Sequence, residues 1–126
     1  MKIAEVMTKD PCCVQCDAPL REAHRLMRAL DARHLPVLAG VRLVGVVSER
    51  DLYLLETVRS VDAGKEPISQ AMTEHPFTVA SAASVREVVR EMREKRYGSA
   101  VVVEKGRVTG IFTRADALRT LEALLK

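Results

Sequence analysis

A gapless internal repeat constrains the fold of this chain more than any other feature of its sequence. Sliding the sequence along itself by 65 residues aligns residues 7–51 with residues 72–116, and fourteen of these forty-five pairs are identical. Others exchange like for like, such as Val46 with Ile111. A fixed period with one supersecondary unit per copy is typical of repeat architectures. We therefore expect two similar units, related by a pseudo-twofold axis, that pack on each other and carry the same chemistry.

Each copy predicts the same order of elements. A short apolar strand follows a proline, at residues 12–15 and 77–80, and an amphipathic helix comes next. Two strands joined by a glycine-containing turn follow, at residues 35–39 and 43–47 and at residues 100–103 and 108–112, before a closing helix. The sequence thus predicts an α/β (α+β) fold. Its two strand-helix-strand-strand-helix repeats, residues 1–62 and 63–126, are expected to pack through their sheets as one compact module.

Composition excludes several classes of protein. Hydrophobic residues make up 48% and charged residues 29%, as in an ordinary soluble domain. The longest apolar run, residues 35–41, is far shorter than the roughly 18 residues of a membrane span, and no signal-peptide pattern opens the chain. We therefore expect a cytoplasmic protein without a membrane partner. Net charge is only +3, and two Tyr, two Phe and no Trp offer little for stacking bases, so nucleic acid is a poor candidate partner.

A repeated motif lies where the last strand of each copy meets the last helix. Residues 45–51 and 110–116 share the order glycine, two apolar residues, Ser or Thr, two variable residues and Asp. The hydroxyl and the acid fit a helix N-cap with a reciprocal bond, which contributes roughly 1 kcal/mol. A functional interpretation adds that a helix N-terminus attracts anions and that glycine permits a ligand to approach closely. Capping alone does not explain why Gly45 and Gly110 precede the motif at the same spacing.

The set of repeated features resembles a tandem pair of CBS domains, also called a Bateman module. The resemblance rests on the element order, the repeated Gly-x-x-Ser/Thr-x-x-Asp motif and the openings at residues 6–8 and 71–73 with their prolines Pro11 and Pro76. The strand start at residues 33–37 matches as well. The resemblance covers nearly the whole chain, from about Ile3 to Leu125.

The resemblance implies binding of an adenosine-containing ligand, such as AMP, ADP, ATP, S-adenosylmethionine or NAD, in clefts between the two copies. By family pattern, Asp51 and Asp116 hold ribose hydroxyls, while Ser48 and Thr113 lie near phosphates. The residues implied around adenine are Thr8, Cys13 and Ala32 in the first copy and Thr73, Thr78 and Tyr97 in the second. Each cleft is expected to combine the motif of one copy with adenine-contacting residues of the other.

The two implied clefts are not expected to be equivalent. Family members often place basic residues near the second strand, and Arg33 and His34 lie there in the first copy. The second copy has Gly98 and Ser99 instead. A guanidinium suits phosphate as a forked donor, although a solvated Arg33 explains the sequence equally well. One cleft is therefore expected to be empty or to bind a different ligand.

Cys12, Cys13 and Cys16 suggest a metal or redox site, but the cluster lacks a second cysteine pair. The second copy has Phe77, Thr78 and Ser81 at these positions, so the fold does not require cysteine there. We interpret the cysteines as small, partly buried residues and predict neither a metal nor a cofactor, only an effector ligand.

Three classes of function remain open. The first is a sensor of an adenosine ligand that regulates a separate, unidentified protein and forms a homodimer through its helices. The second is a ligand-free structural module for dimerisation. The third is an enzyme, which is disfavoured because no base is positioned for the repeated hydroxyl. Motifs retained in both copies favour the sensor.

Overall fold

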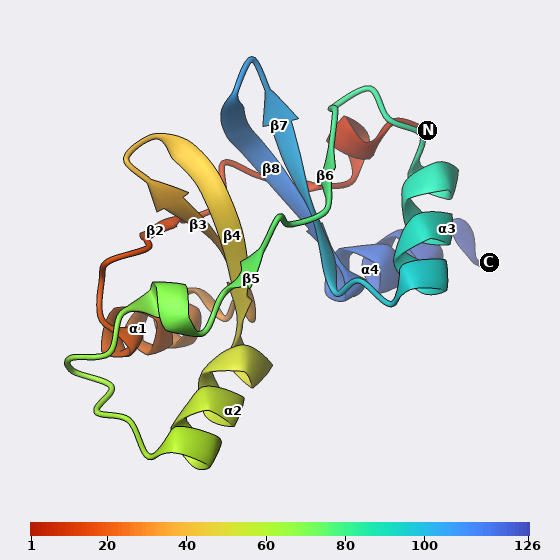
Figure 1. Ribbon diagram of the computed structural model, residues 1–126. Coiled ribbons are helices and arrows are strands. Elements are labelled where there is room, and N and C mark those ends of the chain that lie inside the picture. The colour runs from red at the N-terminus through yellow and green to blue at the C-terminus, as the bar shows by residue number, and fades with distance from the viewer. The chain divides into compact units, whose positions relative to one another are not determined.

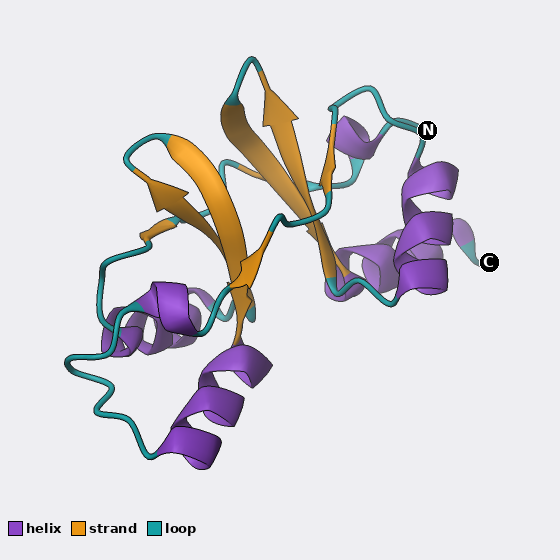
Figure 2. Ribbon diagram, viewed as in Figure 1, coloured by secondary structure: helices purple, strands orange, loops and turns teal.

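The computed structural model describes residues 1–126, apart from the side chain of Arg59. Its chain forms two compact units (Figure 1). The continuous unit is Cys12–Pro76, and the split unit joins Met1–Pro11 to Phe77–Lys126. Both contain helices and strands (Figure 2), which confirms the predicted α/β class. The sequence repeats and the compact units divide the chain at different places because the first eleven residues fold with the second copy.

The continuous unit is a four-stranded sheet with two α-helices. Its elements are β2 (Val14–Gln15), α1 (Leu20–Leu30), β3 (His34–Ala39), β4 (Arg42–Ser48), α2 (Glu49–Arg59), the 3₁₀ helix η2 (Ile68–Gln70) and β5 (Thr73–Glu74). The strand order is β2-β3-β4-β5, with β2 parallel to β3 and the other pairs antiparallel. The predicted order of elements is confirmed, with β5 as an additional two-residue edge strand.

The split unit repeats this arrangement. Its elements are the 3₁₀ helix η1 (Ile3–Glu5), β1 (Thr8–Lys9), β6 (Thr78–Val79), α3 (Val85–Lys95), β7 (Ser99–Glu104), β8 (Arg107–Thr113) and α4 (Arg114–Leu124). The strand order is β1-β8-β7-β6, so β1 holds the edge position that β5 holds in the continuous unit. In both units the edge strand comes from the opening of the other sequence repeat.

Both hairpins turn where the sequence places glycine. Gly40 has φ of 67° between β3 and β4, while Lys105 and Gly106 have φ of 51° and 75° between β7 and β8. Left-handed backbone at these positions matches the right-handed twist of the paired strands. Each hairpin brings the start of its first strand beside the end of its second. His34 therefore pairs with Ser48, and Ser99 pairs with Thr113.

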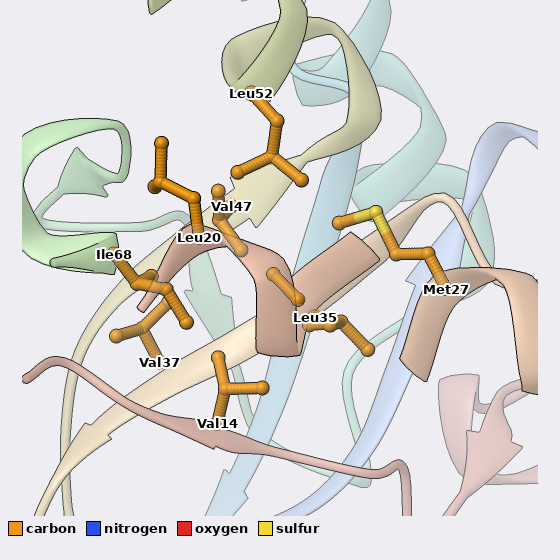
Figure 3. Packing of buried hydrophobic residues seen from close by; sticks show 9 residues of the cluster. Val14, Leu20, Met27, Leu35, Val37, Val47, Leu52 and Ile68 are labelled. Carbon is orange, nitrogen blue, oxygen red and sulfur yellow. The ribbon is translucent and has the colours of Figure 1, made fainter. Parts of the chain in front are cut away.

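The core of the continuous unit combines one helix face with alternate strand residues (Figure 3). Leu20, Ala23 and Met27 follow helical spacing along α1, and all are buried. They pack with buried residues of the sheet, of α2 and of η2, namely Val14, Leu35, Val37, Val47, Leu52 and Ile68. Ile68 is fully buried although it belongs by sequence to the second repeat.

The core of the split unit makes the reciprocal exchange. Ile3, at the start of the chain, is fully buried among residues of α3, β7 and β8, which are Val85, Val88, Met92, Ala100, Val102 and Phe112. The Ile3 N–H donates to Ala83 O at 2.8 Å, as the Ile68 N–H donates to Ala18 O at 2.8 Å. Each repeat thus completes its core with the opening turn of the other.

Across the described residues, no helix has the length and apolar character needed to cross a membrane.

Candidate functional site

The predicted motif forms a helix cap in both units. In the continuous unit, Ser48 Oγ accepts a hydrogen bond from the Asp51 N–H at 3.1 Å. Asp51 Oδ2 accepts one in return from the Ser48 N–H at 2.9 Å. Thr113 and Asp116 form the same reciprocal pair in the split unit. The capping interpretation is therefore confirmed, and any ligand role of these residues must be additional to it.

Asp116 is buried and its carboxylate is fully engaged. The residue is 2% exposed, and Oδ2 accepts from the Thr113 N–H at 2.9 Å and the Thr113 hydroxyl at 3.1 Å. Oδ1 accepts from the Thr8 hydroxyl at 3.0 Å and from Arg119 Nη1 at 2.7 Å. Four donors occupy the acceptor positions that a carboxylate offers. A ribose diol would have to displace Thr8 or Arg119 to reach this carboxylate.

Asp51 keeps an acceptor oxygen available. It is half-buried, and Leu54 occupies the position that Arg119 occupies in the other unit. Within the described residues, Oδ2 bonds to the Ser48 N–H and no hydrogen bond or ion pair reaches Oδ1. Among the residues that the structure describes, Thr73, the counterpart of Thr8, forms no hydrogen bond with Asp51. The two aspartates share one motif but differ in their capacity to bind a further donor.

The sequence analysis did not identify Arg119 as a site residue, although its spacing of three residues from Asp116 predicts a contact between them. Asp116 and Arg119 are three residues apart on α4, where side chains of opposite charge meet. The Arg119 side chain is 68% exposed, while Asp116 is buried. Arg119 therefore covers the Asp116 carboxylate from the solvent side.

The edge strands bring the two predicted threonines to the motifs. Thr8 pairs with Ile111 on β8, and Thr73 pairs with Val46 on β4. Each threonine therefore lies beside the motif of the other sequence repeat. The remaining candidates lie in the same unit as the motif of their own repeat.

In the continuous unit, several candidates lie at the edge of the sheet where β3 begins and β4 ends. Cys13 directly precedes β2, and Ala32 and Arg33 lie between α1 and β3. His34 is paired with Ser48, and the Glu49 N–H donates to Arg33 O at 2.9 Å. Arg33 is exposed, whereas Ala32 and His34 are half-buried. A guanidinium, a helix N-terminus and a partly free carboxylate therefore share this edge.

The corresponding edge of the split unit carries different groups. Thr78 begins β6, and Tyr97 follows the end of α3. The Tyr97 ring stacks on Phe77 with 5.0 Å between the ring centroids. Gly98 and the buried Ser99 stand where the continuous unit has Arg33 and His34. No cationic side chain from these two positions is available to a phosphate here.

Packing against methionine accounts for the repeated glycines. A Cβ atom on Gly45 would lie 2.7 Å from Met72 Sδ and 2.8 Å from the Thr73 carbonyl oxygen. A Cβ on Gly110 would clash with Met7 Sδ and lie 2.9 Å from Met7 Cε. Each glycine thus admits the edge strand supplied by the other repeat. This constraint explains the repeated spacing without a ligand, and ligand contact by Gly45 and Gly110 stays a prediction.

We expect Gly45→Ala to destabilise the protein by about 1–3 kcal/mol, as overpacking does. Gly110→Ala is the matched control and should cost less. The three atoms nearest to its new methyl group all belong to the flexible Met7 side chain, whereas the new methyl group of Gly45→Ala would lie 2.8 Å from a backbone oxygen. Urea unfolding of both variants measures the difference. Equal losses would contradict the packing explanation.

The three cysteines are partly buried thiols. Burial raises the pKa of the Cys13 thiol, and the neighbouring Cys12 adds to that shift. A raised pKa keeps the thiol protonated, whereas metal binding and nucleophilic reactions use the thiolate. The environment of Cys13 therefore favours a packed side chain over a reactive one.

One protein-family model matches this chain at two segments. The model of the CBS domain matches residues 3–55 and again residues 68–123. The inosine-5′-monophosphate dehydrogenase of Korarchaeum cryptofilum is 34% identical over 90% of this chain and 22% of its own length. The uncharacterized protein YlbB of Bacillus subtilis is 34% identical over 91% of this chain and 78% of its own length. The chain thus spans about a fifth of the dehydrogenase but most of YlbB.

Solved structures share the fold. The CBS domain pair of protein MJ0100, in complex with 5′-methylthioadenosine and S-adenosylmethionine, has a TM-score of 0.90 at 22% identity, over 99% of this chain and 98% of that chain. CBSX2 in complex with AMP has a TM-score of 0.80 at 23% identity, over 98% and 97% of the two chains. The CBS domain of a bacterial CNNM/CorC Mg²⁺ transporter, in complex with ATP, has a TM-score of 0.82 at 23% identity, over 97% and 87%.

Proposed function

The chain belongs to the CBS domain family, and we propose that it is a regulatory module that binds an adenosine-containing ligand at the sheet edge of its continuous unit. The resemblance stated from the sequence is confirmed by the family match over both repeats. The three structural neighbours described above were solved with adenosine-containing ligands, which supports this ligand class for the present chain.

The free acceptor of Asp51 is the observation that carries the proposal. A carboxylate with one unused oxygen accepts hydrogen bonds from the two hydroxyls of a ribose, a stronger class of bond because the acceptor is charged. Ser48 and the N-terminus of α2 face the same edge, where backbone N–H groups favour a phosphate. Arg33 and His34 add polar donors there, and Cys13, Ala32 and Thr73 supply the surroundings for adenine.

The split unit is proposed to bind such a ligand weakly or not at all. Asp116 already accepts four hydrogen bonds, and Arg119 and Thr8 compete with a ribose for Oδ1. Gly98 and Ser99 provide no cation for a phosphate. We therefore infer one strong ligand site per chain, in the continuous unit. The sequence predicts two unequal clefts, and this inference says which of them binds more strongly.

Asp51→Ala is expected to weaken adenine nucleotide binding by roughly 10- to 150-fold, since hydrogen bonds to a charged group contribute about 1.5–3 kcal/mol. Calorimetric titration with AMP, ADP, ATP, S-adenosylmethionine and NAD measures affinity and stoichiometry, and circular dichroism checks the fold. Ser84→Ala is the control because it removes the side-chain cap of α3, which belongs to the split unit. Unchanged affinity in Asp51→Ala would contradict the site, and failure of the whole panel to bind would favour the ligand-free structural module.

We further propose that two copies associate through their helices. Large apolar side chains on α2 and α4 face solvent, among them Tyr53, Leu54, Leu118 and Leu121, which are 51–67% exposed. Closed twofold association is the commonest way for soluble proteins to cover such surfaces. Light scattering should give the mass of a dimer, and a monomer at high concentration would contradict this proposal. In this proposal, the dimer signals to a separate protein whether its ligand is bound.

A further inference from the structure

The helices α2 and α4 differ at the residue that lies three positions after the motif aspartate. α4 has Arg119 at this position, and α2 has Leu54. Residues three apart on a helix are neighbours on its surface, so each of these side chains lies next to the aspartate of its own helix. Arg119 Nη1 donates to Asp116 Oδ1 at 2.7 Å, whereas leucine has no group that can donate. This one difference in sequence gives Asp116 a charged partner that Asp51 lacks.

Thr8 also donates to Asp116 Oδ1, but it competes with a ligand less strictly than Arg119 does. The Thr8 hydroxyl both donates and accepts, so it can turn and accept a hydrogen bond from a ribose hydroxyl without leaving its place. A guanidinium has only donors. Arg119 and a ribose hydroxyl therefore need the same acceptor oxygen. Thr73 repeats the hydroxyl beside the other motif, so threonine does not distinguish the two repeats.

The Arg119 guanidinium is held by a single residue. Within the described residues, its only hydrogen-bond and ion-pair partner is Asp116. The Arg119 side chain is 68% exposed, so water can solvate the guanidinium when it turns away. Asp116 is 2% exposed, so it needs another donor in place of the arginine. Access to the carboxylate thus requires the rotation of one exposed side chain and no movement of the backbone.

We propose that Arg119 is an internal competitor, which closes the ligand site of the split unit by occupying the Asp116 oxygen that a ribose would use. This inference rests on the ligand class proposed above and adds the residue that decides which unit binds the ligand. It follows that Arg119→Leu opens the site of the split unit. It also follows that Leu54→Arg closes the site of the continuous unit.

Adenosine is the probe for this competition, because it presents the ribose hydroxyls without a phosphate that would itself attract an arginine. The Asp51→Ala variant serves as the background, since it lacks the carboxylate of the continuous unit. Adding Arg119→Leu to this background should raise adenosine affinity about tenfold, the effect of one hydrogen bond to a charged group. Two-dimensional amide NMR measures the affinity, and the amides of Thr113 and Asp116 report binding in the split unit.

Two control variants separate competition from a general effect of charge. Arg119→Lys keeps a cationic donor beside Asp116 and should raise adenosine affinity less than Arg119→Leu does. Arg107→Leu removes the same charge from an exposed position in the turn region between β7 and β8 and should leave adenosine affinity unchanged. Circular dichroism checks the fold of each variant.

Leu54→Arg is the reciprocal variant. Leu54 is 61% exposed on α2, so an arginine fits at this position without disturbing the core. The new guanidinium should reach Asp51 as Arg119 reaches Asp116. Adenosine affinity of the continuous unit, reported by the amides of Ser48 and Asp51, should then fall about tenfold.

The outcomes distinguish the competitor from the ligand site of the continuous unit. Gained affinity in Arg119→Leu together with lost affinity in Leu54→Arg supports the competition. Unchanged adenosine affinity after Arg119→Leu, or equal affinity of the two units in the wild type, overturns it. A wild-type continuous unit that binds no adenosine, combined with a split unit that gains binding in Arg119→Leu, supports the competitor and contradicts only the site proposed in the continuous unit.

Discussion

Replacing Ile3 with alanine is expected to destabilise the split unit by about 2–5 kcal/mol, the usual cost of truncating a buried isoleucine. Ile3 is fully buried among side chains of α3, β7 and β8. The damage should therefore appear in residues 77–126, although Ile3 lies more than seventy positions earlier in the sequence. Hydrogen exchange followed by mass spectrometry should show lost protection in β7 and β8 and retained protection in β3 and β4.

Two further variants sharpen this test. Lys9→Ala alters an exposed residue of the same opening segment and should leave the exchange of both units unchanged. Ile68→Ala should produce the reciprocal pattern, with protection lost in β3 and β4, because Ile68 is buried in the continuous unit. Loss of protection confined to the repeat that carries each substitution would contradict the exchange of opening segments.

Asp116→Ala should lower stability by about 2–4 kcal/mol. The substitution leaves the half-buried Thr113 N–H without the Asp116 carboxylate as its acceptor, at a cost of about 1–3 kcal/mol, while the N-cap bond from the residue 116 N–H to Thr113 Oγ1 is kept. The Thr8 hydroxyl and Arg119 also lose their partner. Adenine nucleotide affinity should change little, because the proposed strong site lies in the continuous unit.

Urea unfolding measures the loss of stability in Asp116→Ala. Two further variants identify which contacts of Asp116 cause this loss. Asp51→Ala removes only the acceptor of the Ser48 N–H, at a half-buried carboxylate, and should cost about 1 kcal/mol of stability while its nucleotide affinity falls. Arg119→Ala removes one of the four donors to the buried Asp116 carboxylate and should cost less than Asp116→Ala, because Thr113 and Thr8 still donate to that carboxylate. Equal stability losses in the two aspartate variants, with nucleotide affinity lost from Asp116→Ala, would reverse the assignment of the sites.

The sequence alone was sufficient for the fold class, the order of elements and the motif. Those features depend on local patterns: helical spacing at Leu20, Ala23 and Met27, turn residues such as Gly40, and a capping pair at Ser48 and Asp51. Each is set by backbone geometry within a few residues, so one sequence reveals it. The repeat strengthened these predictions, because a pattern that recurs at equivalent positions in both copies rarely arises by chance.

Only the tertiary structure revealed which opening segment completes which core. Ile3 and Ile68 occupy equivalent repeat positions, so the sequence does not distinguish packing within a repeat from exchange between repeats. The exchange explains Gly45 and Gly110, whose missing side chains admit Met72 and Met7. The exchange also separates the two aspartates, since it brings the Thr8 hydroxyl to Asp116 while Asp51 keeps a free oxygen. Burial and hydrogen-bond saturation depend on contacts between residues distant in sequence, and those contacts exist only in the folded chain.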